Sequence, residues 1–133
     1  MDFSIIIVNY NSKRLLYNCV NSVVNNLSDI DYEVIVVDNN SSDNSFDLCR
    51  SIDDERIKMI PLNENLGFAK ANNLGVKHSS GRFLHFLNPD TEVDHKLAED
   101  YKRVIRDSPN NYVYVNPLRD TDGTVYYGKN YIP

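Results

Sequence analysis

Asp90 lies where an apolar run, Phe83 to Leu87, gives way to a polar Asn88-Pro89 step. The run is typical of a buried strand, and in open α/β sheets ligands bind beyond the carboxyl ends of the strands. A carboxylate at such a position can hold Mg²⁺ or Mn²⁺ together with the phosphates of a substrate. Asp90 is therefore the candidate metal ligand. The alternative is that Asp90 or Thr91 caps the helix that follows.

A second carboxylate, Asp38, ends an earlier apolar run, Tyr32 to Val37, and Tyr10 follows another, Phe3 to Val8. An aromatic ring can stack on a nucleobase for roughly 1–3 kcal/mol. A carboxylate can accept the ring N–H of uracil, thymine or guanine, whereas adenine offers only an acceptor at that nitrogen. The two acidic strand ends, Asp38 and Asp90, predict a nucleotide-diphosphate site, and the pairing of Tyr10 with Asp38 favours uracil, thymine or guanine over adenine. The alternatives are that Tyr10 packs on its own loop and that Asp38 and Asn39 only satisfy turn backbone.

A polar segment, Asn63 to Gly75, contains the next candidates. Asparagine is a poor helix former because its side chain competes for backbone hydrogen bonds. The pair Asn72-Asn73 inside a helical stretch therefore indicates a polar role. Lys70, on the same stretch, can approach a diphosphate, and the alternative for this residue is a solvated helix face.

Histidines and cysteines offer no metal site in the sequence. His78, His85 and His95 lack the spacing of metal ligands. We expect His85, which stands inside a strand, to be a core or sheet histidine. Cys19 and Cys49 fall in predicted helices, where buried thiols are expected rather than a disulfide.

Composition limits the class of protein. The chain has 133 residues, 41% of them hydrophobic, and a net charge of −5, which predicts one globular domain. An acidic chain is poorly suited to nucleic-acid backbone, which requires a basic surface. With no apolar stretch of ~20 residues, no polybasic anchor and no visible signal peptide, we expect a cytoplasmic protein. The turn from Asn9 to Ser12 has no glycine, which argues against NAD or FAD binding, and a Walker P-loop is absent.

Apolar spacing sets the expected order of secondary structure. Short apolar runs predict buried strands, and apolar residues three or four apart predict helices, the first capped by Ser12. Strands and helices alternate, with a turn at 120–123. The fold class is therefore α/β: a single domain, 1–133, built as a three-layer α/β/α sandwich with a mainly parallel sheet. The expected strands are Phe3–Val8, Tyr32–Val37, Arg56–Leu62, Arg82–Leu87, Tyr112–Val115 and Thr124–Tyr127, and the expected helices run from Ser12 to Val24, Asn44 to Ile52, Phe68 to His78 and Val93 to Ile105.

Four segments together resemble family 2 glycosyltransferases with the GT-A fold. Ser4–Asn11 is similar to the opening strand and base-binding loop of the family, and Glu33–Asp43 to its second strand with the Val-Asp-Asn-x-Ser-x-Asp signature. Asn63–Gly75 resembles the donor-side helix, and Leu87–Asp90 takes the place of the Asp-x-Asp metal motif. The resemblance covers the N-terminal, nucleotide-binding part of the family. Asn88 replaces the first acid of the motif, a variant typical of a rhamnosyltransferase-like branch.

The resemblance implies inverting transfer of a sugar from a UDP, dTDP or GDP donor to a saccharide or lipid-linked acceptor, in bacterial cell-wall or polysaccharide biosynthesis. Tyr10 would stack on the base, Asp38 would hydrogen-bond it, and Asp90 would hold Mn²⁺ or Mg²⁺. The catalytic base of the family lies downstream, in the acceptor-binding half. No catalytic residue is therefore assigned, and we expect a chain ending at Pro133 to transfer sugar weakly or not at all. The residues implied for nucleotide binding are Asn9, Tyr10, Asn11, Asp38, Asn40, Asn65, Gly67, Lys70, Asn73 and Asn88.

Two other functions stay open. One is a non-catalytic Rossmann-like interaction module without nucleotide affinity. The other is a nucleotidyltransferase, although such enzymes usually carry a Gly-rich, basic loop after the first strand. We further expect peripheral contact with the inner membrane face. Self-association through Tyr112–Pro133, a Tyr- and Val-rich segment, is expected if an apolar surface for the acceptor half is exposed.

Overall fold

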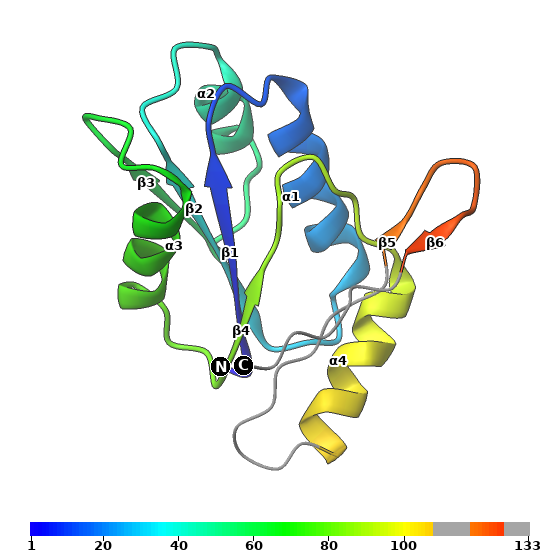
Figure 1. Cartoon of the computed structure of the whole chain (residues 1–133). Helices are drawn as coiled ribbons and strands as arrows, with labels where there is room; N and C mark the ends of the chain where they lie inside the picture. The colour runs from blue at the N-terminus through cyan, green and yellow to red at the C-terminus, as the bar shows by residue number, and fades with distance from the viewer. Residues whose placement is uncertain (108–117, 127–133) are drawn as a thin grey trace.

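A parallel four-stranded sheet with the order β3-β2-β1-β4 forms the centre of the protein (Figure 1). The structure is a computed structural model, and it describes residues 1–107 and 118–126. The strands of the sheet are β1 (Phe3–Asn9), β2 (Tyr32–Asp38), β3 (Ile57–Pro61) and β4 (Phe83–Phe86). The helices are α1 (Arg14–Asn26), α2 (Ser45–Arg50), α3 (Phe68–Lys77) and α4 (His95–Asp107).

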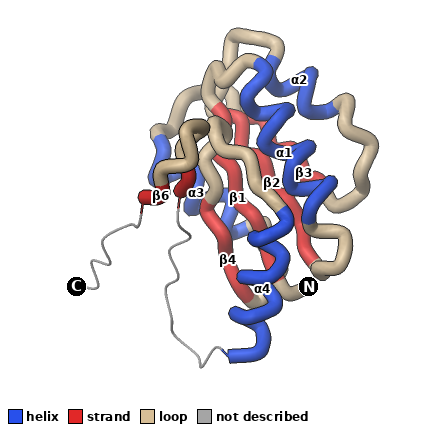
Figure 2. Tube along the Cα trace, turned by 90° about the vertical axis from the view of Figure 1, so that its right-hand side faces the viewer, coloured by secondary structure: helices blue, strands red, loops and turns tan. Residues whose placement is uncertain are grey.

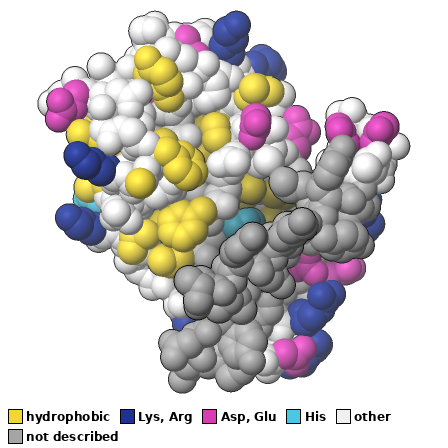
Figure 3. Space-filling model, viewed as in Figure 1, with side chains coloured by type: hydrophobic (Ala, Val, Ile, Leu, Met, Phe, Trp, Pro, Cys, Tyr) yellow, Lys and Arg dark blue, Asp and Glu magenta, His cyan; other side chains and the backbone are white. Residues whose placement is uncertain are grey.

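The central strands β1 and β2 are buried along their whole length. Their near-continuous apolar sequences fit this position, because helices cover both faces of a parallel sheet. The edge strand β4 differs, since Leu84 and Phe86 are 41% and 52% exposed. Both side chains lie on the face that carries α3, where Phe68 is also exposed. Figure 3 shows hydrophobic side chains gathered on this face.

Helices lie on both faces of the sheet. One buried cluster joins the sheet to α1, α2 and α4, with Ile5, Val20 and Tyr101 among its members. A smaller cluster joins Ile35 of β2 to Ala71 of α3 on the opposite face. Figure 2 shows α1 and α4 on one side of the strands and α3 on the other. The predicted three-layer α/β/α sandwich is confirmed.

The direction of the chain reverses after β3. The first crossovers place β2 and then β3 on one side of β1, whereas α3 leads the chain across to β4 on the other side. Right-handed crossovers require the helices of the two directions to lie on opposite faces, as they do here. The reversal makes the carboxyl ends of β1 and β4 a topological switch point, which is the usual ligand site of such a sheet.

Two local predictions differ from the structure. Ser12 does not cap α1: the cap position is Lys13, which has no side-chain cap bond, and the Ser12 hydroxyl bonds to Asn9 Oδ1 instead. The predicted strand at 124–127 is confirmed as one arm of a short antiparallel hairpin outside the main sheet, formed by β5 (Leu118–Arg119) and β6 (Val125–Tyr126). Gly123, with φ of 88°, occupies its turn. Most of Tyr112–Pro133, including the predicted strand Tyr112–Val115, lies outside the described residues.

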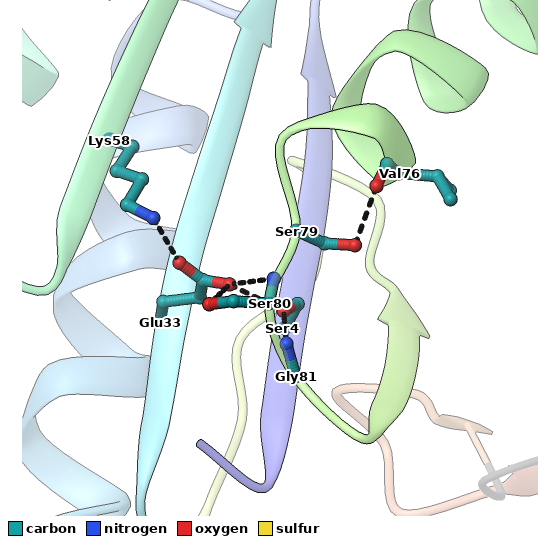
Figure 4. Close-up of polar contacts among 7 residues, drawn as sticks. All are labelled: Ser4, Glu33, Lys58, Val76, Ser79, Ser80 and Gly81. Atoms are coloured by element: carbon teal, nitrogen blue, oxygen red, sulfur yellow. Dashed lines mark hydrogen bonds and ion pairs between the residues drawn. The ribbon is translucent and has the colours of Figure 1, made fainter.

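A buried carboxylate ties the sheet together at the end remote from the switch point (Figure 4). Glu33 of β2 is 1% exposed and accepts hydrogen bonds from Ser4 Oγ (2.6 Å) and from both the N–H and the hydroxyl of Ser80 (2.7 and 2.8 Å). Its other oxygen lies 2.5 Å from Lys58 Nζ. Gly81 N–H donates to Ser4 Oγ at 2.8 Å. These contacts, the Glu33 cluster, fix the loop between α3 and β4 against three strands.

Candidate functional site

A cleft of about 490 Å³ opens at the switch point. Four segments line it: the loops after β1, β2 and β4, and the entry to α3. It therefore collects side chains that are far apart in the sequence at the carboxyl end of the sheet. The lining residues are Val8, Tyr10, Ser12, Asn39, Asn65, Gly67, Phe68, Asn88, Pro89 and Asp90.

Five of the residues proposed from the sequence meet in this cleft: Tyr10, Asn65, Gly67, Asn88 and Asp90. Tyr10 is 54% exposed, and among the described residues no hydrogen bond or ring contact occupies its side chain. Its ring is therefore available for stacking. Sequence reasoning missed Phe68 as a cleft residue, although its place directly after Gly67 at the helix entry is a usable signal.

Asn9 and Asp38 lie beneath the cleft and are bonded to each other. Asn9 Nδ2 donates to Asp38 Oδ1 at 2.7 Å and to Ser45 Oγ at 2.8 Å. Asp38 also accepts the N–H and the hydroxyl of Ser41, at 3.0 and 2.7 Å. A carboxylate offers about four lone-pair positions, and residues of the described chain use three of those on Asp38. The fourth position has no partner among the described residues.

Asn11 turns toward the neighbouring loop. Its Oδ1 accepts the backbone N–H groups of Ser42 (2.8 Å) and Asp43 (3.3 Å), while its own N–H donates to Ser41 Oγ at 2.9 Å. Asp43 in turn accepts the N–H of Lys13 at 2.8 Å. These five residues, the loop bracket, join the segment after β1 to the segment after β2.

The electrostatics of the loop bracket favour a charged Asp43. Burial alone would raise the pKa of this carboxyl. Hydrogen bonds from Ser45 and from the Lys13 N–H outweigh burial, so the pKa lies below its usual range. Asp43 is therefore ionised at neutral pH and acts as an acceptor only.

Hydrogen bonds from backbone N–H groups to asparagine side chains shape the entry to α3. Gly67 has φ of 79°, a left-handed conformation that suits glycine, and its N–H donates to Asn65 Oδ1 at 2.8 Å. Asn39, 3% exposed, accepts the N–H of Leu66 at 2.8 Å. Asn39 thus serves the backbone of the loop before α3 rather than of its own turn, whereas Asp38 does accept a turn N–H, that of Ser41. Because Asn39 also lines the cleft, it links the loop after β2 to the wall formed by α3.

The loop after β4 leaves the Asp90 carboxylate free. The carbonyl of Asn88 accepts the N–H and the hydroxyl of Thr91, at 3.2 and 2.6 Å. The helix α4 begins only at His95, and Asp94 accepts the N–H of Lys96 at 2.9 Å. The alternative in which Asp90 or Thr91 caps this helix is therefore wrong. Within the described residues, no hydrogen bond or ion pair occupies the Asp90 side chain.

Besides Asn9, Asn11 and Asp38, three further proposed residues lie outside the lining of the cleft. Lys70 and Asn73 are exposed on α3, and Asn40 is exposed in the loop after β2 with φ of 63°. The helix asparagine with a clear structural role is Asn72, which is 9% exposed and donates to the Phe68 carbonyl at 3.1 Å. The structure thus separates Asn72 from Asn73, which the sequence pattern grouped together.

The cleft suits an oxygen-liganded cation held jointly with a substrate. Among the described residues Asp90 is the one carboxylate that lines it, and no three His, Cys, Asp or Glu side chains of that part of the chain gather at one point. Mg²⁺ and Mn²⁺ prefer oxygen ligands and commonly use one or two carboxylates with substrate phosphates and water. A free carboxylate beside the Asn88 amide fits such an ion, with most ligands supplied from outside the chain.

His85 and the two cysteines are internal groups on the side of the sheet that carries α1, α2 and α4. His85 Nδ1 lies 2.5 Å from the Tyr101 hydroxyl, and burial lowers the His85 pKa to about 4. Cys19 and Cys49 are fully buried free thiols, with pKa values raised by burial to about 12. The predictions of a sheet histidine and of buried thiols are confirmed.

The family follows from comparison with known sequences. The sequence model described as Glycosyl transferase family 2 matches residues 4–133. The chain belongs to this family. The glycosyltransferase chain is 24% identical over 128 residues to glycosyltransferase GlyG of Streptococcus pneumoniae, a match covering 93% of the chain and 42% of GlyG. It is 37% identical over 87 residues to the Escherichia coli UDP-Glc:alpha-D-GlcNAc-diphosphoundecaprenol beta-1,3-glucosyltransferase WfaP, covering 65% of the chain and 34% of WfaP.

Solved structures agree with this assignment. The crystal structure of Staphylococcus aureus TarS 1-349 in complex with UDP-GlcNAc matches with a TM-score of 0.71 and 27% identity, over 80% of this glycosyltransferase chain and 31% of that chain. The chain thus spans less than half the length of these relatives. Over residues 1–107 and 118–126, no helix combines the length and the apolar character needed to cross a membrane.

Proposed function

We propose that the chain is the donor-binding part of a glycosyltransferase that transfers a sugar from a nucleotide diphosphate to an acceptor hydroxyl, with inversion and with Mn²⁺ or Mg²⁺. The observation that carries the proposal is the cleft at the switch point, which joins the unoccupied Tyr10 ring to the unpaired Asp90 carboxylate. One side chain suits a base and the other suits a metal-bound diphosphate. The fold places both at the strand ends where such sheets bind ligands.

Each cleft residue has a distinct task in this proposal. Tyr10 stacks on the base, and the remaining lone-pair position of Asp38 accepts the base N–H. Asp90 and the Asn88 amide hold the ion, which would offset the charge of the departing diphosphate. The entry to α3 carries no acidic residue in its first turn, so phosphate approaches it without repulsion from the helix.

Uracil is the preferred base of this proposal, with thymine and guanine as alternatives. TarS has been crystallised with UDP-GlcNAc and with UDP, and the name of WfaP gives UDP-Glc as its donor and a diphosphoundecaprenol-linked sugar as its acceptor. These relatives support a UDP-sugar and a lipid-linked or saccharide acceptor in bacterial envelope synthesis. Asn88 stands in place of an acid, a variant typical of a rhamnosyltransferase-like branch. The proposal therefore also includes the donor of a rhamnosyltransferase-like enzyme.

Transfer also requires a general base for the acceptor hydroxyl. Asp90 is the one acid among the described residues that line the cleft, and it is committed to the ion in this proposal. The base would therefore come from outside the described residues.

Calorimetry with UDP, dTDP and GDP, each with and without Mn²⁺, tests the proposal. We expect Mn²⁺-dependent binding of at least one nucleotide, and loss of the Mn²⁺ dependence in Asp90→Asn. Glu92→Gln, an exposed acid two residues away, is the matched control and should behave like the parent protein. A folded sample that binds none of the three nucleotides would refute the assignment and favour a non-catalytic interaction module. Nucleotidyl transfer from a nucleoside triphosphate to a sugar 1-phosphate would instead favour a nucleotidyltransferase.

A further inference from the structure

Three residues without glycine's freedom adopt left-handed backbone conformations around Tyr10. Asn11 has φ of 49°, Lys13 has φ of 55°, and Asn40, in the facing loop, has φ of 63°. Asparagine tolerates this region, but lysine does so at a cost. Lys13 combines its positive φ with ψ of −131°, a region that is sparsely populated for residues with a side chain. Such conformations persist only where surrounding contacts determine them.

The loop bracket supplies those contacts. Asp43 uses one oxygen for the Lys13 N–H (2.8 Å) and the other for the N–H of Ser45 (3.0 Å). Its own N–H donates to Asn11 Oδ1 at 3.3 Å. One carboxylate residue therefore contacts both left-handed residues that follow Tyr10. On the other side of Tyr10, the Asn9 side chain is fixed by Asp38 at 2.7 Å.

Tyr10 depends on its neighbours for its position. Among the described residues nothing bonds to its side chain, and the ring is 54% exposed while lining the cleft. Because no hydrogen bond or ring contact holds the Tyr10 ring, its position depends on the conformation of the backbone that carries it. The residues that fix the backbone therefore decide whether the ring faces a bound base.

We propose that Asp43 is a positioning residue for base recognition: by holding the backbone N–H of Lys13 and the side chain of Asn11, it presents the Tyr10 ring to the base of the nucleotide. Asp43 does not line the cleft and acts through Tyr10. The inference rests on the proposed nucleotide-binding function and adds to it a second loop that controls affinity for the base.

A double-mutant cycle on UDP binding in the presence of Mn²⁺ tests this role. Asp43→Asn keeps the shape of the side chain but places an N–H₂ group against a backbone N–H. One of the two hydrogen bonds from the Lys13 and Ser45 N–H groups is therefore lost. We expect Asp43→Asn to weaken UDP binding about 5-fold or more, and Tyr10→Ala to weaken it about 5- to 100-fold, the value of one stacked base. In the Tyr10→Ala background, Asp43→Asn should have no further effect, since the ring it positions is gone. Asp47→Asn, an exposed acid on α2, is the control.

Equal losses from Asp43→Asn in both backgrounds would overturn the proposal, because a general loss of structure does not depend on Tyr10. If Asp43→Asn does not fold, Asn11→Ala breaks the same bracket from the opposite loop and enters the same cycle.

A readout without nucleotide separates this inference from the proposed function. The protein is labelled with 3-fluorotyrosine, and the Tyr10 resonance is assigned by its absence in Tyr10→Phe. We expect Asp43→Asn to shift or broaden this ¹⁹F resonance and Asp47→Asn to leave it unchanged. An unchanged Tyr10 resonance in Asp43→Asn would overturn the role of Asp43. Failure of UDP to bind the parent protein would contradict the proposed function, while the ¹⁹F result would still decide whether Asp43 holds Tyr10.

Discussion

Replacing Glu33 by Gln should destabilise the protein by about 2–3 kcal/mol at neutral pH. Burial of Glu33 opposes its charge, yet hydrogen bonds from Lys58, Ser4 and Ser80 lower its pKa from 4.5 to about 2. A shift of that size corresponds to about 3 kcal/mol, at roughly 1.4 kcal/mol per pKa unit. The Lys58 side chain is 51% exposed, so water screens its share and the lower part of the range applies. Glutamine keeps one acceptor oxygen for the serines but turns an amide N–H toward Lys58.

The pH dependence identifies the cause of this loss. Because the folded state lowers the Glu33 pKa, the charged carboxylate stabilises the fold fully above pH 4.5 and loses its effect as the pH falls toward 2. The difference in unfolding free energy between the parent protein and Glu33→Gln should therefore be constant from pH 7 to 5 and shrink below pH 4.5. Other carboxylates titrate in both proteins and cancel in the difference.

Urea unfolding followed by circular dichroism at a series of pH values measures the effect. Glu99→Gln, an exposed acid on α4, is the matched control and should change stability by less than about 0.5 kcal/mol. A Glu33→Gln difference below about 1 kcal/mol at pH 7, or one that persists undiminished at pH 2.5, would show that the charge of Glu33 does not stabilise the fold.

Three further substitutions have defined outcomes. Lys13→Gly should raise the free energy of unfolding by about 1 kcal/mol, because it relieves a positive φ of 55° at some cost in chain entropy. Urea unfolding measures the gain, and a lower free energy of unfolding would contradict backbone strain at Lys13. Gly81→Ala should destabilise by about 1–3 kcal/mol, since the added Cβ would lie 2.4 Å from Ser4 N; an unchanged thermal midpoint would contradict this close approach. Burial lowers the His85 pKa from 6.5 to about 4, so the free energy of unfolding should fall by about 3 kcal/mol as the pH drops from 6.5 to 4. His85→Gln should remove this pH dependence. The same pH dependence in His85→Gln would assign it to another group.

The layers of the fold were predictable because apolar patterning carries most of the information. The β1 and β2 sequences are almost wholly apolar, and a strand with this pattern must be covered on both faces. Their burial along the full length confirms the inference. The main-sheet order was not predictable in the same way, since it depends on which side of β1 receives β4. That choice follows from α3 packing on the face opposite α1.

Helix ends were predicted less well because short polar side chains have competing partners. Ser12 has a residue type suited to a cap, yet its hydroxyl bonds to Asn9, three residues earlier at the end of β1. Asp90 stands near the start of α4, but Pro89 and the Thr91 bonds to the Asn88 carbonyl delay the helix until His95. In both cases a partner three residues away in the chain competes with the helix end, and residue type alone does not say which partner is taken.

The same competition divides the candidate site into two kinds of residue, with separable consequences. Tyr10 and Asp90 reach the cleft without partners in the described chain, so Tyr10→Ala and Asp90→Asn should weaken nucleotide binding while leaving the unfolding free energy within about 0.5 kcal/mol. Asn9 and Asp43 are bonded within the loops, so Asn9→Ala and Asp43→Asn should lower stability and affinity together, by about 1–3 kcal/mol of unfolding free energy for each partner group left unpaired. Measuring both quantities for the four variants distinguishes the two kinds. A stable Asn9→Ala that loses only UDP affinity would show that Asn9 binds the nucleotide directly, and that its bonds to Asp38 and Ser45 contribute little to the fold.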